Sequence, residues 1–354
     1  MNIFRKRVIP VSFTDYPGNI VDRSLFETSK YLQIDNNGII KSPLNLIHAA
    51  AIHYNGRFRH SKSLRFLNAF LEIFSSIGEY GDGMLYLNNN ESNEFQKSSS
   101  EVIAVGICIE LTSELFNINK NRIYLIEDTK KRCDFKFIKN SFEYIIESKG
   151  RKGNTTKAIR DVFLKKEQYS DISPKYGVVS SLPRNGEHSS SNVVDPQFEP
   201  RKLSREETIQ RLLSHYSKLS YLAGFWRMGD LLSARAGELG RGTPLSEIDK
   251  KELDYENIIK FGNSFEINVG GFKSRVFFPR DTQFGFRQKY ENMVAFFPIE
   301  EGLIEILNRQ DFSSLEEYRM PSAEDIEIDG NYLSIGNDGS ILMLAPAEFI
   351  NRYR

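Results

Sequence analysis

The chain has 354 residues, carries 47 Lys and Arg against 47 Asp and Glu, and is 40% hydrophobic. This composition excludes an intrinsically disordered chain and a membrane protein built from long apolar spans, and the length predicts roughly two to three domains. The first residues, MNIFRKRVIPVSF, contain basic side chains without a following apolar segment. The most apolar stretch, residues 102–111, is interrupted by Glu110. We therefore expect no signal peptide, no membrane partner and a cytoplasmic location.

The two cysteines, Cys108 and Cys133, both lie in apolar surroundings. Two such residues do not support a disulfide framework or a zinc site. We expect both to be buried free thiols.

Charge is unevenly distributed although its sum is zero. Residues 101–185 contain 16 Lys and Arg against 11 Asp and Glu, whereas residues 301–330 contain two Arg against nine acidic residues. A basic middle region is compatible with binding to a polyanion, and uneven solvated surfaces explain the imbalance equally well. The acidic segment could also mimic nucleic acid and cover the basic region, which gives a hypothesis of regulation from the C-terminal part.

Residues 1–95 predict an N-terminal α+β region. Within it, apolar residues at helical spacing predict a helix; they are Leu64, Leu67, Leu71 and Phe74. The polar residues 88–100 lack periodicity and predict a loop.

Residues 96–184 predict an α/β domain with the element order helix, three strands, helix, strand. The helix is expected over residues 101–118, because this stretch is too long and too apolar for an exposed element. The later elements are expected at 122–127, 133–138, 142–149, 155–168 and 175–182.

Residues 185–204 are rich in proline and serine and predict a linker or long loop. Residues 205–354 predict a C-terminal α+β domain, helical at first and then rich in strands. Ser204 and Glu207 have the spacing of a capping box for its first helix, and a second helix is expected to end at Gly240. Residues 336–339 carry a hairpin signal.

The middle region sets two acids and a lysine on neighbouring strands. If these strands pair as a hairpin through residues 138–141, Asp134 and Glu147 lie together on one face, and Lys149 projects to that same face. Adjacent carboxylates repel each other unless a cation lies between them or one is protonated. A small set of hard oxygen ligands suits Mg²⁺ or Mn²⁺.

A metal ion at this position would activate water and neutralise charge on a phosphate, with Lys149 orienting the water. The pattern therefore predicts phosphodiester hydrolysis. The alternative is a solvated hairpin face on which Glu147 and Lys149 form an exposed ion pair.

Asp134, a gap of twelve residues and then Glu147-Ser148-Lys149 resemble the D…(D/E)xK motif of the PD-(D/E)xK, restriction-endonuclease-like nuclease superfamily. The resemblance covers residues 100–182, and the same order of elements surrounds the motif in that family. Cys133 stands where the family commonly has proline before the first acid. The resemblance implies a Mg²⁺-dependent or Mn²⁺-dependent (endo)deoxyribonuclease in which Asp134, Glu147 and Lys149 are catalytic and the two acids hold the metal.

In this family a glutamate on the first helix often completes the metal site. Glu101 and Glu110 are the candidates, and their separation of nine residues places them on opposite faces of a helix. At most one can face the site. We favour Glu101 because it is expected at the helix start, although an acid in a first turn also suits the helix dipole.

Basic residues follow the motif and are candidates for contacts with backbone phosphates; they are Arg151, Lys152, Lys157, Arg160, Lys165 and Lys166. Each by itself is better explained as a solvated surface residue. As a group they predict a DNA-binding surface.

The sequence thus predicts a nuclease acting on DNA, with RNA left open, in a bacterial restriction or anti-phage defence setting. The flanking regions would serve recognition, oligomerisation or regulation, and a homodimer or a partner such as an ATPase or helicase stays open. The alternative is a catalytically silent, nuclease-like subunit that binds nucleic acid or acts as a scaffold.

Overall fold

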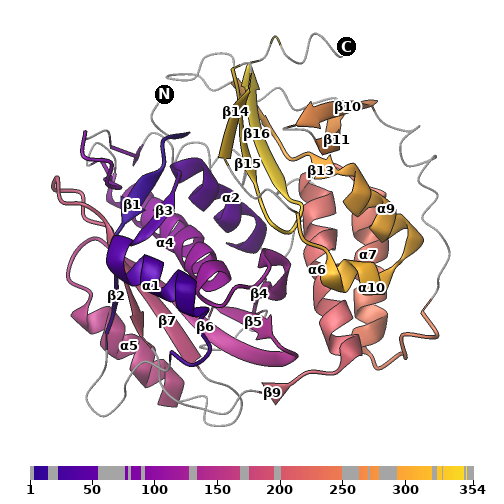
Figure 1. Cartoon of the computed structure of the whole chain (residues 1–354), viewed down its shortest axis with the longest axis horizontal. Helices are drawn as coiled ribbons and strands as arrows, with labels where there is room; N and C mark the ends of the chain where they lie inside the picture. Colours follow the sequence, from indigo (N-terminus) through magenta and orange to yellow (C-terminus); the bar gives the residue numbers. More distant parts are fainter. Residues whose placement is uncertain are drawn as a thin grey trace. The chain divides into compact units, whose positions relative to one another are not determined.

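The structure is a computed structural model of a mixed α/β protein (Figure 1). It describes residues 4–14, 23–54, 76–78, 81–88, 92–126, 134–167, 175–194, 201–248, 263–269, 272–278, 293–320, 325–328, 330–346 and 348. The described residues form two compact units, one up to residue 203 and the other from residue 204 onward. Among these residues, no helix is long and apolar enough to cross a membrane.

The first unit contains four regular helices, a short 3-10 turn and nine strands among the described residues. The helices are α1 (Thr28–Asn37), α2 (Pro43–Tyr54), α4 (Asn93–Leu115) and α5 (Thr156–Glu167), and the 3-10 turn is η3 (Lys120–Arg122). The strands are β1 (Arg7–Ile9), β2 (Val11–Phe13), β3 (Ile39–Lys41), β4 (Ile123–Leu125), β5 (Phe135–Lys139), β6 (Phe142–Arg151), β7 (Lys175–Ser181), β8 (Ser190–Val194) and β9 (Arg201–Lys202).

Seven of these strands form one mixed sheet. Its order is β2-β8-β7-β6-β5-β4, and β9 pairs with the beginning of β6. Strands β5 and β6 form the predicted antiparallel hairpin, with Phe135 opposite Ile146, and β6 runs parallel to β7. The predicted order of helix, three strands, helix and strand is confirmed by α4, β4, β5, β6, α5 and β7.

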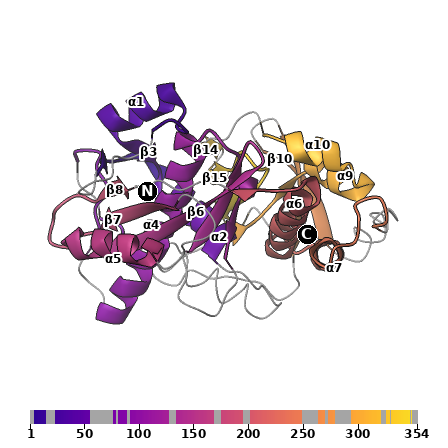
Figure 2. The ribbon, with the colours of Figure 1, turned by 90° about the horizontal axis from the view of Figure 1, so that it is seen from below.

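Helices α4 and α5 cover opposite faces of this sheet. A Cβ atom on Gly150 of β6 would lie 2.7 Å from the Ser100 carbonyl oxygen, so α4 packs directly on that face. A Cβ atom on Gly177 of β7 would lie 2.6 Å from Val162 of α5. Gly177 pairs with Glu147, which neighbours Ser148 and so points to the face away from Gly150. Figure 2 shows α5 beside β7.

An aromatic cluster fills the core on one side of the sheet. The ring of Phe116, just after α4, lies 4.4 Å from Phe137 of β5 and 4.9 Å from Tyr176 of β7, between ring centroids. All three side chains are buried. Such rings stabilise a core both through the apolar area that they bury and through their edge and offset contacts.

The residues expected to form a loop at 88–100 differ from the prediction, because α4 begins at Asn93. Three polar residues of this helical segment, Gln96, Ser99 and Ser100, are buried and hydrogen-bonded. Arg184 donates to the Gln96 carbonyl oxygen at 3.1 Å and to the Ser99 hydroxyl, and Lys152 donates to the Gln96 side chain at 2.7 Å. Tertiary partners thus replace the missing apolar periodicity. The helix predicted around Leu67 lies outside the described residues.

The segment predicted as a linker, residues 185–204, also differs from the prediction. It contains β8, which lies between β7 and β2 in the sheet, and β9, which pairs with β6. The sheet therefore joins parts of the predicted N-terminal region, central domain and linker within one unit. The serine-rich composition predicted a loop here. In the sheet, Ser180 of β7 and Ser191 of β8 are buried, and their hydroxyls hydrogen-bond to each other at 2.9 Å.

The second unit contains four helices and seven strands among its described residues. The helices are α6 (Arg205–Leu222), α7 (Trp226–Gly240), α9 (Glu301–Arg309) and α10 (Phe312–Glu317). The strands are β10 (Asn263–Val269), β11 (Phe272–Phe278), β12 (Met293–Phe296), β13 (Ile299–Glu300), β14 (Asp325–Ile328), β15 (Asn331–Ile335) and β16 (Ile341–Pro346).

The capping box of α6 is confirmed, since Ser204 Oγ accepts from Glu207 N and Glu207 accepts from Ser204 N. The helix predicted to end at Gly240 is α7. The hairpin signal is confirmed by β15 and β16, in which Ile335 pairs with Ile341. Part of the acidic segment forms α9 and α10. Glu300, directly before this segment, accepts from two backbone N–H groups of α9, and Asp311 within it accepts from Ser314 N. Those charges serve local structure.

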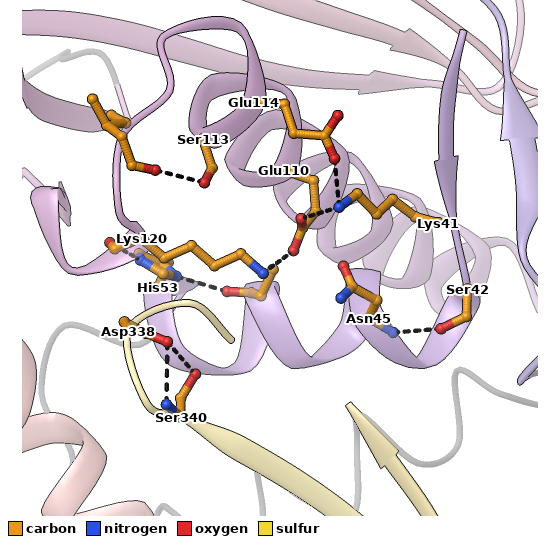
Figure 3. Close-up of polar contacts among 12 residues, drawn as sticks. Lys41, Ser42, Asn45, His53, Glu110, Ser113, Glu114, Lys120, Asp338 and Ser340 are labelled. Atoms are coloured by element: carbon orange, nitrogen blue, oxygen red, sulfur yellow. Dashed lines mark hydrogen bonds and ion pairs between the residues drawn. The ribbon is translucent and has the colours of Figure 1, made fainter. Parts of the chain in front are cut away.

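The turn of this hairpin is fixed by a buried polar group. Asp338 is fully buried, accepts from the Ser340 hydroxyl at 2.6 Å and lies 2.8 Å from His215 Nε2 of α6 (Figure 3 draws the Asp338–Ser340 contact). A buried carboxylate needs such partners, and here they attach the turn to the helix.

Candidate metal and nucleic-acid site

A cleft of about 480 Å³ lies where α4, β4, β5 and β6 meet. It is lined by Glu101, Val105, Leu125, Asp134, Phe135, Ser148, Lys149, Gly150 and Arg151. Four residues predicted for the site, Glu101, Asp134, Lys149 and Arg151, are therefore brought together by three separate elements.

The hairpin places the first acid at the rim of this cleft. Continuing the register of β5 and β6 by one residue sets Asp134 opposite Glu147, because Phe135 pairs with Ile146. Asp134 Oδ2 accepts a hydrogen bond from Ser148 N at 3.0 Å. Directly opposite residues have Cβ atoms roughly 5 Å apart. The predicted proximity of the two acids thus follows from the observed register.

Glu147 is buried, with only 1% of its side chain exposed, and does not line the cleft. Its Oε1 atom lies 2.5 Å from Nζ of Lys149, whose side chain is 21% exposed and lines the cleft. The alternative of an exposed ion pair on a solvated face does not hold, since one member is buried. Burial strengthens the electrostatic interaction and makes the carboxylate depend on a cation.

The thiol of Cys108 on α4 lies within the electrostatic reach of both acids. Burial raises the pKa of Cys108, and the charges of Asp134 and Glu147 raise it further. Cys108 is fully buried and therefore a protonated thiol at neutral pH. The prediction of a buried free thiol is confirmed for Cys108, whereas Cys133 lies outside the described residues.

The two candidate glutamates of α4 have different environments. Glu101 is exposed and lines the cleft, about two turns after Asn93 and not at the helix start as predicted. Glu110 is 1% exposed and lies in a separate buried cluster (Figure 3). Only Glu101 is therefore placed with Asp134 and Lys149.

The buried cluster around Glu110 contains two lysines. Lys41 of β3 lies 3.0 Å from Glu110 Oε2 and 2.6 Å from Glu114, and Lys120 of η3 contacts Glu110 Oε1 (Figure 3). With its amide nitrogen facing the carboxylate, Asn45 donates to Glu110 Oε1 at 2.7 Å. Sequence reasoning missed this cluster, because the lysines are distant in sequence and only the acid interrupts an apolar helix.

The six basic residues predicted to contact DNA lie on more than one element, on β6, just after it, and on α5. Arg151 lines the cleft and lies 3.7 Å from Asp161 of α5. Lys152 is exposed and donates to Gln96, whereas Lys157 and Arg160 are exposed on α5. Lys165 and Lys166 lie on the same helix, and their side chains are outside the described residues. Of these residues, only Arg151 lines the cleft.

The carboxylates at and beside the cleft determine whether a divalent cation would fit there. In the described part of the chain, no group of three or more His, Cys, Asp and Glu side chains is arranged to hold a metal. Mg²⁺, however, is commonly bound by one or two carboxylates, with water and substrate phosphate completing its octahedron. Asp134 and Glu147 satisfy that smaller requirement, and Glu101 supplies a further carboxylate at the cleft.

The chain was compared with protein-family models, with curated proteins and with solved structures, and no match was found. The chemical interpretation of the site therefore depends on the geometry of its residues.

Proposed function

We propose that this protein is a Mg²⁺-dependent nuclease that hydrolyses phosphodiester bonds of DNA. The observation that carries the proposal is the pairing of Asp134 with the buried Glu147 by strand register, together with a cleft that Asp134, Lys149 and Glu101 line. The resemblance of these residues to the PD-(D/E)xK motif supports the same reaction class and a restriction-endonuclease-like arrangement of the sheet.

Asp134 and Glu147 would hold the metal ion, with Glu101 contributing from α4. When bound, the ion supplies charge neutralisation at the phosphate and an acidified water molecule. Oxygen ligands favour Mg²⁺ or Mn²⁺ over zinc.

The remaining roles belong to the cations of the cleft. Lys149 lines the cleft and its ammonium group is held by Glu147, so it could orient a water molecule towards a phosphate. It can also neutralise the charge that develops on the phosphate oxygens. Arg151, two residues further along β6, would bind a neighbouring phosphate.

This activity fits restriction or anti-phage defence in bacteria, and the second unit would supply recognition, oligomerisation or regulation. A homodimer or an ATPase or helicase partner would be compatible with these roles.

The proposal is tested with purified full-length protein. We expect cleavage of plasmid DNA in Mg²⁺ or Mn²⁺ but not in EDTA. We also expect Mn²⁺ binding, measured by calorimetry, to weaken by more than about tenfold in Asp134→Asn, because this change removes a charged ligand. Asp161→Asn is the matched control, since Asp161 is partly exposed on α5 and does not line the cleft. Equal Mn²⁺ affinity in Asp134→Asn and wild type would contradict the assignment.

The second candidate is a silent, nuclease-like subunit that binds nucleic acid. It is favoured by the ion pair that already joins Glu147 to Lys149 and by the lack of a three-residue metal cluster among the described side chains. Binding of DNA or RNA without cleavage of either polymer in any divalent metal would support it.

The exposed basic side chains of α5, Lys157 and Arg160, predict an affinity for DNA that falls as salt rises. Replacing Lys157 and Arg160 together with alanine should weaken DNA binding and lower the slope of log affinity against log salt by about 1.8, or 0.9 for each lost phosphate contact. The measurement is fluorescence anisotropy with a labelled duplex over a salt series. Lys30→Ala with Lys202→Ala removes the same charge from other exposed positions and should leave the slope unchanged. A slope unaltered in the α5 variant would remove this helix from the binding surface.

A further inference from the structure

A second buried carboxylate lies on the same strand as Glu147. Glu143 of β6 is fully buried, and its Oε1 atom lies 2.6 Å from Nζ of Lys136. Its other oxygen accepts a hydrogen bond from the hydroxyl of Tyr124 on β4. Two donors thus fix this carboxylate, and its lack of exposure excludes it from contact with a ligand in solution.

The register places Lys136 between Glu143 and the candidate metal ligands. Lys136 pairs with Ile145, which lies two residues after Glu143 and two before Glu147 on β6. Residues two apart in a strand project to the same face, so Lys136 shares this face with Asp134 on its own strand and with Glu147 diagonally across the hairpin. The register thus sets three carboxylates on the face of Lys136, and its ammonium group is bound to one of them, Glu143.

The carboxylate to which Lys136 binds affects the charge at the candidate metal ligands, Asp134 and Glu147. An ammonium group between Asp134 and Glu147 would neutralise the carboxylates and compete with a divalent cation for them. Lys149 already contacts one of them, so a second lysine would leave the pair with little net negative charge. In the structure Lys136 is bound instead to Glu143, one step further along the hairpin.

We infer that Glu143, fixed by Tyr124, is a positioning residue that restrains Lys136 and so preserves the divalent-cation affinity of Asp134 and Glu147. This inference rests on the proposed function, because it concerns the same metal ligands. It assigns a role to a buried network that makes no contact with metal or substrate.

The experiment measures Mn²⁺ affinity of the full chain by calorimetry in Glu143→Gln. The isosteric amide can still accept from Tyr124 but no longer carries the charge that holds Lys136. We expect Mn²⁺ binding to weaken on the order of tenfold, since one additional positive charge then lies next to the ligands. Lys136→Met should bind Mn²⁺ as wild type does, and Glu143→Gln combined with Lys136→Met should regain wild-type affinity.

Rescue by the double variant separates positioning from general destabilisation. Glu110→Gln is the control for the general effect of losing a buried carboxylate. It alters another buried ion cluster of the same unit and should leave Mn²⁺ affinity unchanged. Wild-type affinity in Glu143→Gln, or weak binding that persists in the double variant, would overturn the inference while Asp134→Asn still tests the site. If wild type and Asp134→Asn bind Mn²⁺ equally, the proposed function itself fails.

Discussion

Lys149→Met should reduce the rate of Mg²⁺-dependent DNA cleavage by about 10²- to 10⁴-fold, the range typical of a side chain that assists proton transfer or positions water. The same substitution should leave Mn²⁺ affinity at the wild-type value or raise it. The reason is the 2.5 Å contact between Lys149 Nζ and Glu147 Oε1, through which the proposed catalytic lysine would also compete with the metal for that carboxylate. Single-turnover cleavage and Mn²⁺ calorimetry measure the two effects separately.

Glu147→Gln provides the contrast, since it should reduce both cleavage and metal binding. Lys202→Met is the matched control, because this exposed lysine of β9 does not line the cleft. If Lys149→Met cleaves DNA as fast as Lys202→Met, the assignment of Lys149 is wrong. If it weakens Mn²⁺ binding as strongly as Glu147→Gln does, the division between ligand and water-orienting group is wrong.

Glu110→Ala should lower the free energy of unfolding by about 3–5 kcal/mol, the cost of leaving buried charges without their partner. Glu110 is 1% exposed, and its carboxylate lies between Lys41 and Lys120 (Figure 3). Removing it exposes two positive charges to each other in a region shielded from water. Chemical denaturation monitored by circular dichroism measures the change.

Glu114→Ala is the control for this effect. Its side chain is 27% exposed and contacts Lys41, whose side chain is 19% exposed, so solvent screens the pair and the loss should be under about 1 kcal/mol. Replacing Lys41, Glu110 and Lys120 together with apolar residues of similar size should recover most of the loss. Equal destabilisation by Glu110→Ala and Glu114→Ala would contradict this prediction, because the buried ion pairs would then contribute no more to the free energy of unfolding than the partly exposed one.

Acid pH should act on this cluster in a defined direction. Burial raises the pKa of Glu110, but the charges of Lys120 and Lys41 outweigh burial and hold that pKa below its ordinary value of 4.5. Because the folded-state pKa is the lower one, this stabilisation is present above pH 4.5 and is lost as the pH falls through the folded-state value. Unfolding free energy should therefore depend less steeply on acid pH in Glu110→Gln than in wild type.

Local patterns sufficed where neighbouring residues determine the structure. Alternating apolar residues predicted β5 and β6, the Ser204 and Glu207 spacing predicted the start of α6, and the glycine-rich turn predicted the hairpin of β15 and β16. The same alternation brought Asp134 and Glu147 together, because hairpin register depends on a short loop.

Patterns failed where distant partners satisfy polar groups. The polar residues at the start of α4 are helical because Arg184, from a later segment, hydrogen-bonds them. Strand β8 is a strand because β2 and β7 pair with its two edges. Hydrogen bonds between segments far apart in sequence do not produce a local pattern of apolar residues, so a sequence pattern cannot predict them.

The hairpin with its two acids and its lysine could be predicted from local pattern, because strand alternation and a short turn depend on neighbouring residues. That Glu101 lines the cleft while Glu110 is bound by two lysines depends on tertiary packing, since both glutamates lie on one helix and differ only in what packs against them. Tertiary packing also decided that Glu147 is buried beneath Lys149 and that Glu143 holds Lys136, because burial depends on the whole sheet and its covering helices.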